Sequence, residues 1–173
     1  EYYKIKFKSR VYTPLNNSEK YTLVLMGRAD FGLLGSYNKY KQTPFETFHV
    51  GGDGMTGSYT YATETIGLRG YDNGALTPYS DGRAYTRFSM ELHFPFLLQP
   101  SSTIYGLAFV EGGNAWTSLE NFNPFSLKRS AGVGVRIFLP MIGLMGIDWA
   151  YGFDKVQGEK GGGHFHFILG QEF

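Results

Sequence analysis

Cysteine is absent from the 173 residues, so neither a disulfide framework nor a thiolate metal site is available to this chain. Sixteen basic residues are matched by fifteen acidic ones, which leaves a net charge of +1. Nucleic-acid binding depends on an excess of positive charge, so no nucleic-acid partner is expected. Long apolar runs are also missing. The most apolar stretch, Ile137–Ile147, is interrupted by Pro140 and Gly143 and is shorter than the roughly 20 residues that a transmembrane helix needs.

Glycine and aromatic residues, by contrast, are frequent. The chain has 24 glycines, 13 tyrosines and 15 phenylalanines, and 42% of its residues are hydrophobic. The glycine share is roughly twice the average of globular proteins. This combination is typical of a membrane β-barrel, which has an apolar outer face and a polar inner face.

Seven segments alternate between apolar and polar side chains, as β-strands do. They cover about residues 2–13, 21–34, 84–94, 103–116, 128–139, 144–153 and 164–173. Their length suits tilted strands that cross a bilayer. A soluble antiparallel sandwich or barrel also alternates. Small residues on one face of segment 128–139, and charges on the polar face of nearly every segment, favour the membrane. The sequence therefore predicts an all-β fold, an antiparallel transmembrane β-barrel of the outer-membrane type.

This fold implies which side chains meet lipid and which face the interior. We expect six apolar side chains to face outward: Phe88, Leu92, Val133, Ile137, Trp149 and Phe165. Four charged side chains should face inward: Glu91, Glu111, Arg136 and Asp148. Between the second and third segments, about residues 35–83 are expected to form a long irregular extracellular loop, and loops of this length are usually functional or disordered.

The long loop contains the segment Leu68-Arg69-Gly70-Tyr71. A solvated arginine in a surface loop is one interpretation. The alternative is that Arg69 folds into the barrel, because a carboxylate that faces the interior needs a partner and a guanidinium binds it in a bidentate fork. We therefore predict that Arg69 bonds Glu91, Glu111 or both, with Phe109 beside the guanidinium. Glycine at position 70 would let the backbone approach the barrel wall closely.

Other charged and titratable residues receive plainer interpretations. His93, His164 and His166 could suggest a metal site, but His164 and His166 have neither a nearby cysteine nor a clear acid partner in the sequence. Interior or surface histidines are expected instead. The basic stripe Lys4, Lys6, Lys8 and Arg10 is expected to face the interior, balanced by acids on other strands. Asp148 and Asp154 are not accompanied by anything else that resembles an acid–base site. No catalytic residue, metal or cofactor is expected, and the protein is predicted not to be an enzyme.

Several segments together resemble the barrel of the BamA family of outer-membrane protein assembly factors, in the order in which that family has them. Leu68–Tyr71 is similar to the family signature in its long sixth extracellular loop. The further matches are Pro44-Phe45-Glu46 and Gly51-Gly52 before this signature, and Ser89–Leu92, Phe109–Trp116, Arg129–Gly134 and Phe167–Phe173 after it. The resemblance implies the C-terminal half of a barrel of about 16 strands. The family's POTRA domains and first barrel strands are absent from these residues, so we expect a piece of a longer protein.

The resemblance also implies a function in the bacterial outer membrane. Proteins of this kind insert nascent outer-membrane proteins through a lateral seam between the first and last strands, and here Phe167, Gly170 and Phe173 would belong to the closing strand of that seam. Nascent outer-membrane proteins, accessory lipoproteins of the assembly machine, and membrane lipids including lipopolysaccharide are the implied partners. The alternatives are a TamA-like or two-partner-secretion pore of the same superfamily, or a passive porin.

Overall fold

The computed structural model describes residues 2–16, 18, 21–37, 46–55, 63–79, 81–156, 158 and 162–170. Its elements are β1 (Tyr2–Pro14), β2 (Val24–Ser36), β3 (Phe48–Val50), β4 (Glu64–Ile66), β5 (Ala84–Gln99), β6 (Ser102–Trp116), the short 3-10 helix η1 (Leu119–Asn121), β7 (Lys128–Leu139), β8 (Gly143–Gly152) and β9 (Gly162–Leu169). Within the described residues, no helix is long and apolar enough to cross a membrane.

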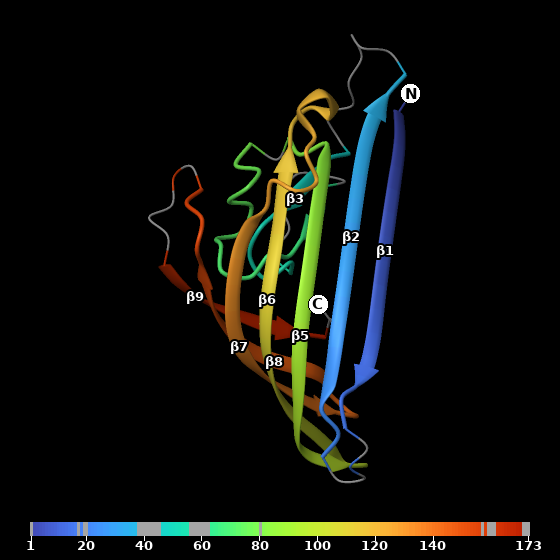
Figure 1. Ribbon diagram of the computed structural model, residues 1–173, viewed down its shortest axis with the longest axis vertical. Helices are drawn as coiled ribbons and strands as arrows, with labels where there is room; N and C mark the ends of the chain where they lie inside the picture. The colour runs from blue at the N-terminus through green and yellow to red at the C-terminus, as the bar shows by residue number, and fades with distance from the viewer. Residues whose placement is uncertain are drawn as a thin grey trace.

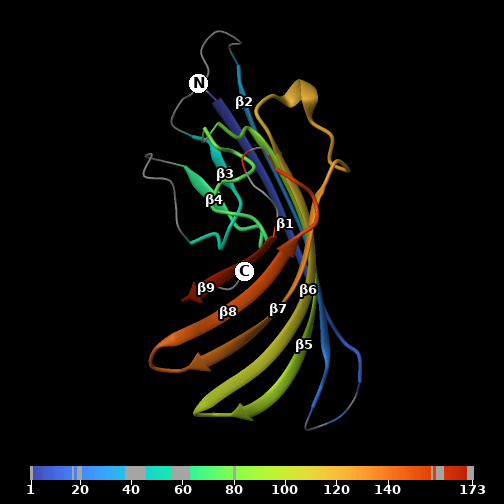
Figure 2. The same cartoon turned by 90° about the vertical axis from the view of Figure 1, so that its left-hand side faces the viewer.

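The seven long strands form one antiparallel sheet in the order β1-β2-β5-β6-β7-β8-β9. Each strand pairs with its neighbours along the chain, apart from the excursion of β3 and β4 between β2 and β5. The sheet curves strongly, and β3 and β4 lie on its concave side (Figures 1 and 2). The predicted all-β, antiparallel architecture is confirmed. The described part of the sheet is an open wall, with β1 and β9 at its two edges.

The end of the third predicted strand differs most from the structure, for a physical reason. The third segment is predicted to end at about residue 94, directly before Pro95. Proline donates no hydrogen bond to a neighbouring strand, so the interior of a strand usually lacks it. In the structure β5 continues to Gln99, and its register against β6 shifts between Pro95 and Leu97. Such an irregularity accommodates the missing donor. Residues 97–99 therefore belong to the strand, and the connection to β6 is shorter than expected.

The long loop was predicted to be irregular, and this was wrong for part of it. Phe48–Val50 and Glu64–Ile66 pair in parallel as β3 and β4. Strands of three residues are too short to give a readable alternation, so the pattern of the sequence did not reveal them. Their apolar side chains form a core with the inner face of the sheet, made of Leu34, Phe48, Val50, Ile66 and Tyr85. The loop is therefore packed against the wall of the barrel.

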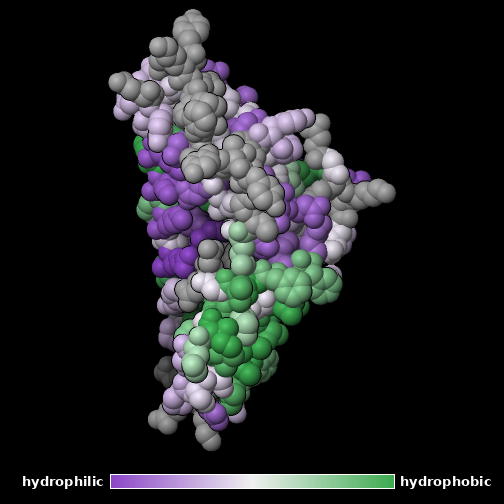
Figure 3. All heavy atoms as spheres, turned by 180° about the vertical axis from the view of Figure 1, so that it is seen from behind, coloured by the Kyte–Doolittle hydropathy of each residue, from purple (hydrophilic) through white to green (hydrophobic). Residues whose placement is uncertain are grey.

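The predicted division of the two faces is confirmed. Val133, Trp149 and Phe165 lie side by side across β7, β8 and β9 and are exposed on the outer face. The four charged side chains expected to face inward, Glu91, Glu111, Arg136 and Asp148, are all buried. Figure 3 shows an extended hydrophobic surface on the lower part of the molecule and a hydrophilic column above it, on the left.

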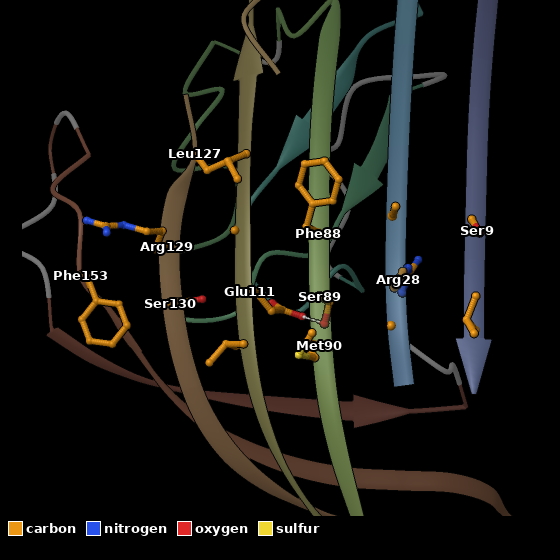
Figure 4. A pocket seen from close by; sticks show the side chains of 15 residues that line it. Ser9, Arg28, Phe88, Ser89, Met90, Glu111, Leu127, Arg129, Ser130 and Phe153 are labelled. Atoms are coloured by element: carbon orange, nitrogen blue, oxygen red, sulfur yellow. Dashed lines mark hydrogen bonds between the residues drawn. The ribbon is translucent and has the colours of Figure 1, made fainter. Parts of the chain in front are cut away.

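An apolar hollow on the outer face crosses five strands from β1 to β7 (Figure 4). Phe88 and Met90 of β5 line this hollow, and Met90 is exposed. Gly27 forms part of its floor, and a Cβ atom built on Gly27 would meet nothing within 4 Å. Ser89, between Phe88 and Met90, is buried and donates to Glu111 Oε1 at 3.1 Å. Alternate residues of one strand thus line the apolar outer face and the polar interior.

Candidate functional site

The loop motif Leu68–Tyr71 is held on the inner face of the sheet. Its first residue, Leu68, exchanges backbone hydrogen bonds with Gly52 (N to O distances of 3.1 and 3.2 Å), so the Gly51-Gly52 element directly supports the motif. Arg87 of β5 donates from Nη1 to the carbonyl of Gly67 at 2.6 Å. Hydrogen bonds therefore hold the backbone at Gly67 and Leu68, the two residues that precede Arg69.

Arg69 is fully buried and bonds three carboxylates. Its Nε donates to Glu111 Oε1 at 3.1 Å and its backbone N–H to Glu111 Oε2 at 2.9 Å. Nη2 donates to Glu91, and Nη1 to Asp148 Oδ2 at 3.0 Å. The guanidinium carbon lies 3.6 Å from the centre of the Phe109 ring. The predicted contacts with Glu91, Glu111 and Phe109 are all present, and Asp148 is an additional partner.

The register of the sheet explains why these side chains meet. Glu91 of β5 lies directly opposite Phe109 of β6, and Glu111 follows Phe109 by two residues on the same face. On β8, Asp148 lies opposite Gly134 of β7. Carboxylates from three strands therefore converge around one guanidinium, with an aromatic ring in their midst.

The small residues of β7 provide the space for this arrangement. A Cβ atom on Gly132 would lie 2.6 Å from Cζ of Phe109, and one on Gly134 would collide with the Asp148 carboxylate. The small face that the sequence shows on this strand thus accommodates the ring and the acid that surround Arg69. A larger residue at either position would displace a partner of the arginine.

The electrostatics of the site keep Arg69 charged. Burial alone lowers the pKa of an arginine, but the charges of Glu111 and Glu91 outweigh burial and raise the pKa of Arg69 above its ordinary value. Asp148 is shared with a second cation, because Arg136 Nη2 donates to Asp148 Oδ2 at 2.7 Å. Every acid of the cluster therefore has a cationic or polar partner, and a buried charge without such a partner would be costly.

Gly70 and Tyr71 pack the motif directly against the inner face of the sheet. Gly70 has a φ of +91°, and a Cβ there would lie 2.7 Å from Cβ of Ser130. The approach is reciprocal, since a Cβ on Gly152 of β8 would lie 2.5 Å from the carbonyl oxygen of Gly70. Tyr71 is buried and donates its hydroxyl to the carbonyl of Arg129 at 2.7 Å. The predicted close approach at position 70 is confirmed.

We expect Gly70→Ala and Gly152→Ala each to destabilise the docked loop by about 1–3 kcal/mol, because each added methyl group meets the opposing chain and Gly70 also holds a positive φ. The measurement is the thermal unfolding midpoint of the full-length protein in detergent micelles. Gly27→Ala is the matched control, since its Cβ projects into open space. Equal midpoints for Gly27→Ala and Gly152→Ala would show that the close packing has no energetic weight.

The basic stripe of β1 faces inward and is balanced in part by an acid on another strand, as expected, and in part by an acid of the loop. Lys4 contacts Glu46 at 3.1 Å and Glu64 at 3.0 Å, and Lys6 contacts Glu64 at 3.0 Å. These acids belong to the loop and β4 rather than to strands of the large sheet. Burial raises the pKa of Glu64, but hydrogen bonds from Lys6 and Lys4 outweigh burial and hold the pKa below its ordinary value. These pairs stabilise the fold above the ordinary glutamate pKa, and the contribution is lost as the pH falls through the lowered value.

The histidines are also better connected than the sequence suggested. His164 Nδ1 lies 3.2 Å from Asp72 Oδ1, and His93 Nε2 lies 2.8 Å from Glu91 Oε2. His166 Nε2 accepts from the backbone N–H of Gly70 at 3.0 Å. Among the described residues no cluster of three or more acidic or imidazole side chains is arranged to hold a metal ion.

The closing strand β9 presents Phe167 on the outer face, where the side chain is exposed. β9 ends at Leu169, and Gly170 follows with a φ of +72° while its N–H donates to the carbonyl of Leu144 at 2.7 Å. A positive φ at this point suits glycine and turns the chain at the end of the strand. Phe173 lies outside the described residues. The role of these three residues in a seam stays a prediction.

Sequence reasoning missed four residues of the site: Arg87, Asp148 as a partner of Arg69, Gly152 and His166. Asp148 and His166 carried a usable signal, because both lie on the polar faces of their strands and the two are directly opposite in the register of β8 and β9. That signal becomes specific only when the register is known. Gly152 and the Gly67 carbonyl that Arg87 binds could not be found from the sequence, because neither contact depends on a recognisable side chain at the glycine.

Comparisons with known proteins agree with this arrangement. A model of the Omp85 superfamily domain matches residues 1–173, the whole chain. The chain is also similar to the crystal structure of BamA from Haemophilus ducreyi lacking POTRA domains 1–3, with a TM-score of 0.62 and 20% sequence identity. The match covers 96% of this chain and 34% of that one, so the chain spans about a third of that protein's crystallised length. At this identity the likeness shows a common fold.

Proposed function

Because the chain belongs to the Omp85 superfamily, we propose that it forms part of a bacterial outer-membrane barrel that folds nascent outer-membrane proteins and inserts them into the bilayer. The single observation that carries the proposal is the docking of Arg69. The interior of a porin is a water-filled channel, whereas loops plug the interior of other outer-membrane barrels. Here the loop is fixed by a buried arginine with three carboxylates, and it contacts the strand that ends the sheet.

The proposed mechanism uses the backbone of β9. An edge strand offers N–H and C=O groups to an incoming strand, which is how β-augmentation works. β9 has β8 on one side, and its outward side chains Phe165, Phe167 and Leu169 are apolar and exposed. A nascent strand that pairs with the other side of β9 would enter the bilayer with its own apolar face aligned to these residues. No covalent bond is made or broken, so no catalytic residue or cofactor is assigned.

The implied partners follow from this mechanism. Nascent outer-membrane proteins are the proposed substrates, accessory lipoproteins are the proposed protein partners, and outer-membrane lipids, including lipopolysaccharide, would surround the apolar outer face. A translocation or secretion pore of the same superfamily is the second candidate function. Family membership favours it equally, because the match is to the superfamily domain.

The two candidates are separated by the fate of the substrate. The full-length protein is reconstituted into liposomes and given an unfolded outer-membrane barrel protein. We expect the barrel to become heat-modifiable and protease-resistant in the bilayer faster than in liposomes without the protein. Substrate that collects inside the liposome lumen would instead identify a translocation pore, and no acceleration with either readout would overturn both assignments.

A further inference from the structure

The long loop touches the closing strand β9 at three places. Gly70 of the motif donates its N–H to His166, and Asp72 lies 3.2 Å from His164. Near the end of the strand, the N–H of Leu169 donates to Met55 Sδ at 3.2 Å. These contacts come from two separate parts of the loop and are spread along most of β9. The loop thus lines the inner side of the strand that would open in the proposed mechanism.

The contact at His166 is the most specific of the three. His166 is buried, and its Nε2 accepts the backbone N–H of Gly70 at 3.0 Å. Accepting at Nε2 requires the neutral imidazole with its hydrogen on Nδ1, because a protonated ring has no acceptor. Gly70 is also the residue between Arg69 and Tyr71, so the hydrogen bond joins β9 to the centre of the docked motif.

We propose that His166 is a positioning residue that fastens the loop motif to the closing strand, so that docking of Arg69 and the stability of β9 are coupled. The coupling follows from linkage: if the docked loop stabilises β9 through His166, an intact β9 must stabilise the docked loop to the same extent. Opening of the seam would then require release of the Gly70 contact. This consequence rests on the proposed function, whereas the contact and the coupling do not.

The surroundings of His166 favour this role over one in packing alone. Asp148 lies opposite His166 in the register of β8 and β9, and it binds Arg69 and Arg136. His164 stacks on His166 with ring centres 6.2 Å apart. The imidazole of His166 therefore lies between the Arg69 cluster and the contact of His164 with Asp72. A rearrangement of the loop at this point would act directly on β9.

Hydrogen exchange of the full-length protein in lipid nanodiscs tests the proposal without any substrate. In His166→Leu the exchange rate of the Gly70 amide is expected to rise roughly tenfold, the effect of losing one hydrogen bond. His166→Gln keeps an acceptor at the same distance from Cα, and its rate should stay within about twofold of the wild type. Phe165→Leu, on the outer face of the same strand, is the matched control and should leave the amide unchanged.

The coupling is tested from the other end. Arg69→Ala should accelerate exchange of the β9 amides from His164 to Ile168 more than exchange of the amides in the middle of β1, which reports the general loss of stability. In Arg69→Ala/His166→Leu the effects on β9 should be less than additive. If the His166→Leu protein does not assemble into a barrel, the exchange rates of the β9 amides in Arg69→Ala test the proposal instead. Wild-type exchange at Gly70 in His166→Leu, equal acceleration in His166→Gln, or unchanged β9 protection in Arg69→Ala would each overturn the proposal. Failure of the liposome insertion assay alone would bear only on the proposed function.

Discussion

Arg69→Ala is expected to lower the free energy of unfolding of the barrel by about 3–5 kcal/mol and to abolish most of its insertion activity. The substitution removes the shared cation of Glu91, Glu111 and Asp148. Asp148 keeps Arg136 and Glu91 keeps His93, but Glu111 is left buried without a cation, with only the Ser89 hydroxyl and the backbone N–H of residue 69 as donors. The cost arises mainly from that stranded charge, and it will be smaller where water enters the emptied space.

The measurements for this variant are the thermal unfolding midpoint and the rate of barrel insertion into liposomes, both with the full-length protein. Arg69→Lys should recover part of each, because lysine restores one charge but cannot bond three carboxylates with a planar fork. Arg129→Ala is the control, since Arg129 is an exposed arginine paired with Asp154 and lies outside the cluster. An Arg69→Ala protein that matches the wild type in both assays would show that the docked arginine is not needed.

A disulfide across the proposed seam should stop insertion almost completely and restore it on reduction. The described strands contain no cysteine, so paired cysteines introduced at Ile168 of β9 and on the first strand of the full barrel would face no competing thiol in this region. Ile168 faces inward, away from lipid, which keeps the crosslink within the protein wall. The expected effect is large because a covalent bond prevents the edge of β9 from pairing with a substrate strand.

The crosslink is verified by its shift on a denaturing gel, and activity is measured before and after reductant. The same two single-cysteine variants, each without its partner, control for damage from the substitutions. Normal insertion by a fully crosslinked protein would exclude lateral opening and would leave translocation through the interior as the function to examine.

The sequence alone determined the fold class and the two faces of the wall. Alternation with a period of two is a local property, because neighbouring side chains of a strand must point to opposite sides wherever the strand lies. Thus Val133, Trp149 and Phe165 were assigned to the outer face, and Glu91, Glu111, Arg136 and Asp148 to the inner face, before any pairing was known. The pairing of Arg69 with Glu91 and Glu111 was also predictable, since interior carboxylates need a cation and the loop offers one.

Only the tertiary structure decided how the loop is fastened. Asp148 is 79 residues from Arg69, and His166 is 96 residues from Gly70. Neither contact leaves a local pattern, because it depends on the register of several strands at once. The same holds for the three-residue strands β3 and β4 and for the ion pairs between Glu64 and the lysines of β1. In both cases the interacting segments are far apart in the sequence and meet only when the chain folds. Gly152 is the simplest example. A glycine is needed at this position because the Gly70 carbonyl approaches it closely, and the sequence does not reveal which backbone lies opposite.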